Sequence, residues 1–426
     1  MSTGGSQTGS VIYLGRVYTP LKGGGWLDLP HGAIVVNEGG NITAVGPSVE
    51  LSKEIASSRV LDYGDCVVIP GLVDCHQHLS HFHWMRLIPN LQEWLREIYR
   101  LEEAFAATAF SEQTARSFFT ELVRNGTTTC CVHGPYFAEA TDAAFEVASA
   151  TDLRVIMGMN AGDKDLPISL AKDPSASTLE AAELCKRWDN GNDGLLSYCF
   201  TVRPGYCASA ELLAAVAREA ATRNARVQCH LGEDVKGGEQ ILRCFPEHAT
   251  ETDMYDAFGL LDNRTIMAHG VHLSDAEYEL LHIRGVGIAH CPRANLLAGG
   301  RQMDLRKIQQ VGIEVGLGTD LGAGKGLSMF RTMEDALKVT PSLSVHDLFR
   351  LATTGGAKVL GLHERIGTLE PGMDADFVFL APKIDVNAKE CYAIEDVLSA
   401  LVFRGDDRDV QAAYVRGRRL DPAGCC

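Results

Sequence analysis

The chain has 426 residues, of which 46% are hydrophobic and 22% are charged, and its formal net charge is −16 at pH 7. This length predicts one large domain with a smaller partner. A surface this acidic repels phosphate backbones and anionic membranes, so we expect no nucleic-acid partner and no membrane partner.

Three further features bear on the location of the protein. No run of about 18 apolar residues is present that could span a bilayer. Residues 1–10 are polar and lack the basic and apolar regions of a secretory signal, so we expect a short disordered leader. The 13 cysteines are scattered without a CxxC pair, which favours reduced thiols and a cytoplasmic protein.

Both ends of the chain contain short apolar runs separated by turn residues. Glycines interrupt the first part at residues 23–25 and 39–40, and turn sequences occur at 370–372 and 416–418. The predicted strands are residues 11–14, 33–37, 42–45, 376–380 and 413–415. We therefore expect residues 1–70 and 365–426 to form together a small β-sandwich domain.

The middle of the chain alternates between apolar β-branched runs and amphipathic helical patterns. The predicted strands are residues 67–73, 127–132, 154–159, 196–202, 225–230, 265–269, 286–290 and 312–317. Continuous apolar strands alternating with helices indicate a parallel sheet covered on both faces. Eight such units predict an α/β fold, a (β/α)8 TIM-like barrel over residues 71–364. An open doubly wound sheet is the alternative, but no GxGxxG motif follows the first strand.

Histidine and aspartate occur where several of the predicted strands end. Active-site groups of a (β/α)8 barrel lie at the C-terminal ends of its strands. Residues two apart on one strand point the same way, so two histidines of the first strand can both face the barrel mouth. The candidates are His76 and His78 after the first strand, His230 after the fifth, His269 after the sixth, His290 after the seventh and Asp320 after the eighth.

These residue types suit a metal-activated water. Imidazole binds zinc or iron well, and a carboxylate such as Asp320 completes the ligand set. The metal can lower the pKa of a bound water from 15.7 to about 7. A lone HxH pair is as often structural as metal-binding, whereas the whole set indicates a metal site. For His290 we favour a structural role.

Glu233 follows His230 by three residues, at the end of the predicted fifth strand. That spacing places a carboxylate above the metal without making it a ligand, so it can shuttle a proton. A second metal would need a bridging carboxylated lysine at the end of the fourth strand. Residues 198–203 contain no lysine, which favours one metal. The H-x-E…P-C-x-x-C signature of cytidine deaminases is also absent.

Several segments carry a family resemblance. Residues 69–78 read IPGLVDCHQH, and residues 316–324 read GLGTDLGAG and are followed by Leu327, Ser328 and Met329. Further segments are RNGTTT at 124–129, MAHG at 267–270, HCP at 290–292 and IGTLEPGMDAD at 366–376. Over nearly its whole length the chain resembles the amidohydrolase superfamily, specifically its guanine deaminase branch.

The resemblance implies a homodimeric cytoplasmic enzyme that hydrolyses guanine to xanthine and ammonia. It also implies one Zn²⁺ per chain, with Fe²⁺ as the alternative metal. The implied metal ligands are His76, His78, His230 and Asp320. The implied catalytic residues are Glu233 as the proton shuttle, His269 to orient the water, and Asp320 to take the proton of that water. The implied substrate contacts are Arg203, His81 and Trp94.

The sequence departs from the family around the substrate rather than around the metal. His81 stands where a base-reading Gln is expected, and Pro204 stands where a Phe is expected. In the HCP segment, Arg293 and Ala294 are also unusual. These changes leave open a deaminase of another amino-heterocycle, such as a pterin, 8-oxoguanine or an s-triazine. A barrel relative without catalytic activity is the other alternative.

Overall fold

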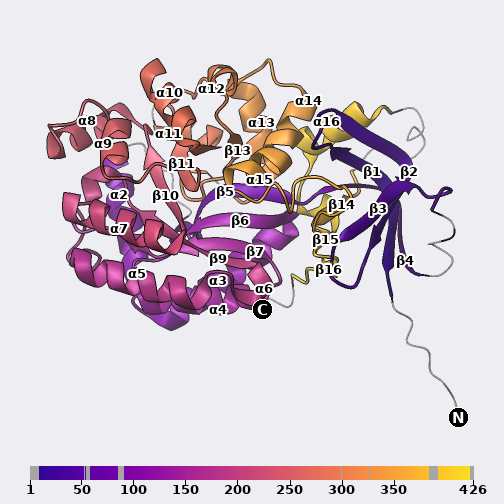
Figure 1. Ribbon diagram of the computed structural model, residues 1–426, viewed down its shortest axis with the longest axis horizontal. Coiled ribbons are helices and arrows are strands. Elements are labelled where there is room, and N and C mark those ends of the chain that lie inside the picture. The colour runs from indigo at the N-terminus through magenta and orange to yellow at the C-terminus, as the bar shows by residue number, and fades with distance from the viewer. Residues whose placement is uncertain are drawn as a thin grey trace, which may run out of the picture.

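The computed structural model describes residues 9–51, 53, 58–84, 91–298, 300–324, 326–382 and 392–422. It consists of a barrel surrounded by helices and a separate sheet at one end of the molecule (Figure 1). Among the helices of these residues, none is long and apolar enough to cross a membrane. Nine cysteines of the described ranges are free thiols: Cys75, Cys130, Cys131, Cys185, Cys199, Cys207, Cys229, Cys244 and Cys291.

The barrel strands are all parallel, and each is hydrogen-bonded to the next in chain order. This confirms the predicted (β/α)8 architecture. The last strand lies beside the first, and the backbone N–H of Asp320 donates to the carbonyl oxygen of His76 over 3.0 Å. A short strand, β8 (Asn160–Ala161), also pairs with β9. The barrel strands are β5 (Leu72–His78), β6 (Thr127–His133), β7 (Arg154–Gly158), β9 (Leu196–Val202), β10 (Arg226–Leu231), β11 (Thr265–His269), β12 (Gly287–His290) and β13 (Val315–Leu317).

The first barrel strand differs from the prediction. Residues 67–70 belong to β4 (Arg59–Pro70), which pairs with β1 and β14 of the separate sheet, and the barrel strand begins only at Leu72. The break falls at Gly71, where any Cβ would lie 2.0 Å from the hydroxyl oxygen of Thr128. The prediction ran through this point because the apolar run is buried in both sheets, so hydrophobicity does not change where the chain leaves one sheet for the other.

Helices cover the outside of the barrel, as Figure 1 shows. The connections that follow β5 and β10 each carry two α-helices, and α2 of the first and α8 and α9 of the second lie at the end of the barrel away from the separate sheet. The helices are α2 (Leu91–Ala104), α3 (Thr108–Arg124), α4 (Ala138–Ser149), α5 (Pro174–Trp188), α6 (Gly191–Gly194), α7 (Ala210–Arg223), α8 (Val235–Cys244), α9 (Glu251–Ala257), α10 (Asp275–Arg284), α11 (Pro292–Ala298), α12 (Leu305–Val311), α13 (Met329–Val339), α14 (Val345–Arg350), α15 (Gly356–Val359) and α16 (Ile394–Arg404).

The inside of the barrel is filled by small side chains. Cys75, Cys131, Cys199 and Ala289 come from four different strands and pack in one buried cluster. The space is so limited that a Cβ on Gly316 would lie 2.5 Å from the sulfur of Cys75. The interior is therefore a packed core, and functional groups are confined to its ends.

The two chain ends form one seven-stranded sheet, which confirms the predicted small β-domain. Its strand order is β16-β15-β14-β4-β1-β2-β3. The N-terminal and C-terminal parts meet where β14 pairs antiparallel with β4, the strand that leads into the barrel. The remaining strands are β1 (Val11–Pro20), β2 (Trp26–Val36), β3 (Ile42–Pro47), β14 (Phe377–Leu380), β15 (Val410–Val415) and β16 (Arg418–Arg419).

A buried ion cluster joins the barrel to this sheet. Arg154, at the start of β7, is 2% exposed, and its Nη2 lies 2.8 Å from Asp374 Oδ2 and 3.0 Å from Asp376 Oδ2. Arg365 and Arg416 also contact Asp374. The cluster lies at the start of β7, so it stabilises the end of the barrel opposite the candidate site.

We expect Arg154→Met to lower the free energy of unfolding by about 3–5 kcal/mol, because it leaves buried carboxylates without their main partner. Urea unfolding followed by circular dichroism measures the change. The control is Arg187→Met, because Arg187 pairs with Asp142 and Glu146 but is 54% exposed. It should cost less than about 1 kcal/mol. Equal losses in the two variants would contradict the assignment.

Candidate active site

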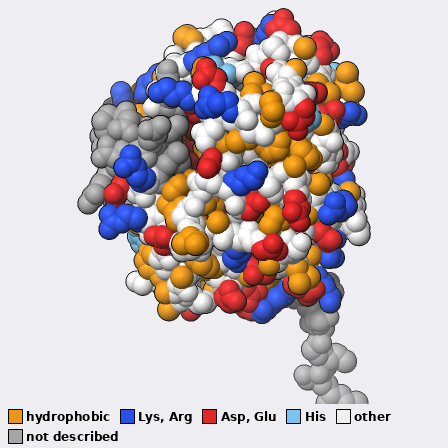
Figure 2. Space-filling model, turned by 90° about the vertical axis from the view of Figure 1, so that its left-hand side faces the viewer, with side chains coloured by type: hydrophobic (Ala, Val, Ile, Leu, Met, Phe, Trp, Pro, Cys, Tyr) orange, Lys and Arg blue, Asp and Glu red, His pale blue; other side chains and the backbone are white. Residues whose placement is uncertain are grey.

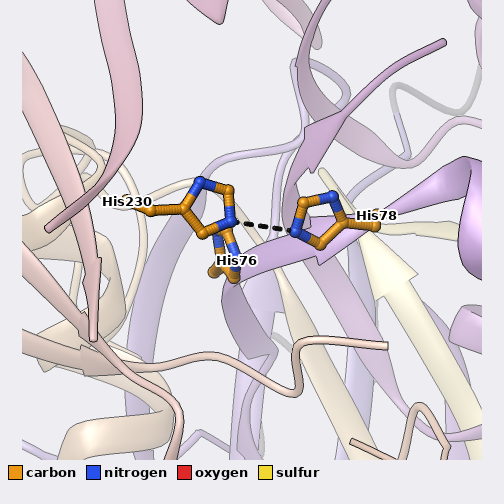
Figure 3. Close-up of side chains that lie close together, drawn as sticks. All are labelled: His76, His78 and His230. Carbon is orange, nitrogen blue, oxygen red and sulfur yellow. Dashed lines mark hydrogen bonds between the residues drawn. The ribbon is translucent and has the colours of Figure 1, made fainter. Parts of the chain in front are cut away.

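The predicted metal-binding residues meet at the mouth of the barrel. His76 and His78 lie on β5, His230 lies near the end of β10, and Asp320 follows β13. All four are buried. Figure 3 shows the imidazoles of His76, His78 and His230 turned toward one another, as expected for two residues of one strand facing a third across the barrel.

The distances between these side chains fit a small metal ion. The Nε2 atoms of His78 and His230 are 3.2 Å apart. Asp320 Oδ1 lies 3.4 Å from His76 Nε2 and 3.5 Å from His78 Nε2. Ligands about 2.0–2.1 Å from a tetrahedral ion are about 3.3 Å from one another. The donor set therefore fits a metal such as zinc.

The electrostatics of the site also fit metal binding. Burial, reinforced by the neighbouring histidines, holds the pKa values of His78 and His230 well below the ordinary value. These rings are therefore neutral, as metal ligands must be. Burial raises the pKa of Asp320, but the hydrogen bond with His76 and the nearby histidine charges outweigh it, so the pKa is lowered and the carboxylate is ionised.

Many polar atoms at this end of the barrel are buried and have no hydrogen-bond partner. They include His269 Nε2 and Arg203 Nε, and also the Nδ1 atoms of His78 and His230, on the side of each ring away from the Nε2 atoms that meet. A buried polar atom without a partner lowers stability, and such atoms are few in folded proteins. Of these atoms, His269 Nε2 and Arg203 Nε are ones that a bound polar group would satisfy.

Asp74 holds the barrel closed beneath the metal-binding residues. Its carboxylate accepts from the backbone N–H of Thr319 over 3.1 Å and from the Thr319 hydroxyl over 2.8 Å. Burial raises the pKa of Asp74 to about 7. Because Thr319 precedes Asp320, this contact fixes the position of the Asp320 carboxylate relative to His76. Asp320 itself has a φ of +48°, a conformation that non-glycine residues rarely adopt outside functional sites.

His269 and Glu233 lie beside the metal-binding residues. His269 closes β11 with a φ of +77°, and its Nδ1 lies 2.9 Å from Asn295 Oδ1. Since an amide oxygen only accepts, Nδ1 carries the proton and Nε2 faces the site. That Nε2 is 3.8 Å from Glu233 Oε2. Burial raises the pKa of Glu233, which suits a group that exchanges protons near neutral pH.

Two of the three predicted substrate contacts lie next to this cluster. Arg203 follows β9 and is buried. Burial lowers the pKa of its guanidinium, but the nearby Tyr136, Tyr99 and Glu102 raise that pKa by more, so the group is charged. His81 stacks on His78 with ring centroids 4.3 Å apart, and its Nε2 lies 3.4 Å from Glu102 Oε1. Trp94 falls in α2, but its side chain lies outside the described part of the chain.

Two residues in and next to the HCP segment, Arg293 and His290, have structural explanations. Arg293 Nε lies 2.5 Å from Asp335 Oδ2 on α13, so its charge is neutralised away from the metal-binding residues. His290 is fully buried, and burial lowers its pKa to about 3. Among the described residues, two groups could hold a metal: His76 with His78 and His230, and His76 with His269 and Asp320. His290 belongs to neither. These observations support the structural role predicted for His290.

The sequence reasoning missed one histidine of this site. His133 is the last residue of β6 and its ring lies 4.6–4.9 Å, centroid to centroid, from those of His76, His78 and His230. The predicted strand ended one residue earlier, at 132. Extending that strand by one residue would have added a histidine at a strand end to the other candidates.

The face of the molecule at the barrel mouth carries hydrophobic, acidic and basic side chains side by side, without a field of one sign (Figure 2). Below it, a small cavity is lined by Pro204, Tyr206, His230, Glu233 and Glu251. Glu251 Oε2 accepts from the backbone N–H of Gly232 over 3.0 Å and so holds the turn that carries Glu233.

Comparisons with known proteins agree with this geometry. Residues 67–420 match the amidohydrolase family. The guanine deaminase of Escherichia coli strain K12 is 33% identical over 371 residues, which cover 84% of each chain. A solved E. coli guanine deaminase structure superimposes with a TM-score of 0.91 at 29% identity, covering 97% of this chain and 99% of the other. An adenosine deaminase from Xanthomonas campestris, solved with bound zinc, has a TM-score of 0.84 at 25% identity and covers 97% of this chain and 95% of its own.

The matched region includes every barrel strand and every residue of the candidate metal centre. Amidohydrolases depend on a metal, and the His and Asp cluster described above provides the ligands that such a metal needs. The chain therefore belongs to the amidohydrolase family, in the group that contains these guanine deaminases.

Proposed function

We propose that this protein catalyses the hydrolytic deamination of guanine to xanthine and ammonia. The observation that carries the proposal is the convergence of three histidines and Asp320 at the barrel mouth, beside Glu233 and His269, in a chain similar to guanine deaminases. Loss of an amino group from a ring carbon needs an activated water and a proton shuttle. This cluster contains candidates for both.

We propose Zn²⁺ as the metal, one per chain, held by His76, His78, His230 and Asp320. The metal would supply hydroxide at neutral pH by lowering the pKa of water. Fe²⁺ is the alternative, because imidazole and carboxylate ligands accept either metal. Zinc is supported by the fit of the ligand distances and by the zinc-bound adenosine deaminase of the same fold.

The protein residues divide the proton transfers between them. Asp320 is ionised and takes the proton of the attacking water. His269 orients the water through Nε2, which is held toward the site by the bond between Nδ1 and Asn295. Glu233 gives its proton to the ring nitrogen, and its raised pKa favours the protonated form that this step requires. When the intermediate collapses, the amine leaves as ammonia with the proton that Asp320 took from the water, and the remaining hydroxyl proton returns to Glu233. Arg203 donates to the oxygen and nitrogen acceptors of the purine.

The second candidate function is the same chemistry on another amino-heterocycle, such as a pterin, 8-oxoguanine or an s-triazine. His81, paired with Glu102 where a Gln is expected, is the observation that favours it. Measuring ammonia release from a panel of purines, pterins and triazines separates the two candidate functions. Release from another heterocycle of the panel, without release from guanine, would favour the second function. A barrel relative without catalytic activity is disfavoured, because relatives that lose activity typically lose metal ligands and this chain has the complete predicted set.

We further propose that the protein is a cytoplasmic homodimer. We also propose that its domains divide at residues 70/71 and 364/365. The free thiols among the described cysteines support a reducing compartment. Sedimentation equilibrium tests the dimer directly.

Removing the metal should abolish activity. Dialysis against a chelator is expected to stop ammonia release from guanine, and stoichiometric Zn²⁺ should restore it, because no water is activated without the metal. Elemental analysis before and after dialysis provides the measurement. Undiminished activity in a protein that holds no metal would contradict the proposal.

Glu233→Gln should lower kcat by about 10²–10⁴-fold while metal content stays stoichiometric, because the amide keeps the shape but cannot carry a proton. The matched control is Asp234→Asn in the next position. Asp234 accepts from the backbone N–H groups of Lys236 and Gly237 at the start of α8, and asparagine also caps helices well. The control should stay within about threefold of the parent. Loss of the metal from Glu233→Gln would instead make Glu233 a ligand.

Arg203→Ala should raise KM for guanine by about tenfold or more, because it removes charged hydrogen-bond donors from the substrate pocket. Steady-state kinetics of ammonia release checks this. The control is Arg226→Ala at the opposite end of the barrel, where the Arg226 Nε donates to the carbonyl oxygen of Leu360. An unchanged KM in Arg203→Ala would argue against Arg203 as a substrate contact.

A further inference from the structure

His133 is a fully buried histidine that the mechanism above does not use. It closes β6, and its ring lies against three of the proposed metal ligands, 4.6 Å from His78 and 4.9 Å from His76 and His230 between centroids. It nevertheless belongs to neither of the two side-chain groups of the described residues that could hold a metal. Its position next to the metal centre therefore needs another explanation.

The hydrogen bond to Asn160 determines which atom His133 presents to the site. His133 Nδ1 lies 3.1 Å from Asn160 Oδ1, and an amide oxygen only accepts, so Nδ1 is the donor. In the neutral ring Nε2 then carries a lone pair. That Nε2 is buried and has no hydrogen-bond partner. Such an acceptor destabilises the fold unless a ligand donates to it.

The neighbours of His133 place this acceptor beside the proposed base-binding residue. Asn160 lies on β8, which pairs with β9, and the backbone N–H of Arg203 after β9 donates to the carbonyl oxygen of Ala161 over 3.1 Å. The Arg203 charge is also close enough to help lower the pKa of His133, although burial and His76 contribute more. The segment that carries Arg203 is thus tied by its backbone to β8, whose Asn160 holds the His133 ring.

We propose that His133 is a specificity-determining residue whose Nε2 accepts a hydrogen bond from a ring N–H of the substrate. This inference rests on the proposed function. It narrows the substrate to amino-heterocycles that present a ring N–H to His133 and a carbonyl or ring-nitrogen acceptor to Arg203. Guanine has both. A ring with only a lone pair at that nitrogen would bring two acceptors together and bind weakly.

A chemical double-mutant cycle tests the proposal. Binding is measured by calorimetry in the metal-loaded Glu233→Gln protein, so that no turnover interferes. The ligands are guanine and three analogues of nearly the same size. 2-Aminopurine lacks both the hydrogen at N1 and the oxygen at C6, so only the part of its penalty that depends on His133 reports on N1. In 7-deazaguanine and 9-deazaguanine one imidazole nitrogen is replaced by carbon. The same four ligands are then measured after adding His133→Leu.

If His133 accepts a hydrogen bond from a ring N–H, the analogue that lacks this N–H should bind about tenfold or more weakly than guanine. We call this ratio of Kd values the penalty. His133→Leu should reduce the penalty to about threefold or less. His133→Gln should restore part of the penalty, since its side-chain oxygen is also an acceptor. Asn160→Leu, which frees the His133 ring, should reduce the penalty as well, and it provides a second test if His133→Leu does not fold.

The control is His282→Leu, because the Nδ1 of His282 lies 3.2 Å from the carbonyl oxygen of Gly312 on an exposed part of the barrel. It should leave all the penalties unchanged. Three outcomes would overturn the proposal. The penalties could be equal with and without His133, guanine could fail to bind, or His133→Gln could lose the metal. Failure of the proposed function is seen separately, as a wild-type protein that releases no ammonia from guanine.

Discussion

The site depends on the closure of the barrel between its first and last strands. The hydrogen bond from the Asp320 N–H to the His76 carbonyl oxygen, and the contacts of Asp74 with Thr319, join β5 to the residues that follow β13. This junction brings a carboxylate from late in the chain within 3.5 Å of two histidines from early in the chain. Without it, the imidazoles of β5 would have no anionic partner and the metal centre would be incomplete.

The same arrangement lowers the stability of the folded chain. Buried polar atoms without partners gather at the barrel mouth, and two residues there, His269 and Asp320, have positive φ angles. Such strain and desolvation persist only where the surrounding structure enforces them. Here the enforcing structure is the tightly packed barrel interior, and the Arg154 ion cluster secures its other end against the separate sheet. The functional end and the stabilising end of the barrel are thus opposite ends.

The metal centre and the substrate wall follow different rules. The metal ligands need only the correct atoms at about the correct separations, so the donor set matches the family closely. Under the proposed function, Arg203, His81, Glu102 and His133 would have to match one particular ring, and their hydrogen-bonding groups would select among substrates. The departures from the family pattern at His81 and Pro204 fall on this side of the site. Under the proposed function, the chemistry and the substrate specificity would therefore come from different sets of residues.

The sequence by itself predicted the barrel, the paired chain ends, and the histidines and the aspartate that meet at the barrel mouth. These follow from local features: strand–helix alternation, and histidine or aspartate at the ends of strands. Only the tertiary structure decided that the apolar run at 67–73 is split between two sheets, because burial is the same on both sides of Gly71. Only the tertiary structure brought His133, Asn160 and Glu102 to the site. Their positions depend on contacts between segments that are far apart in the sequence, and the spacing of residues along the chain does not reveal such contacts.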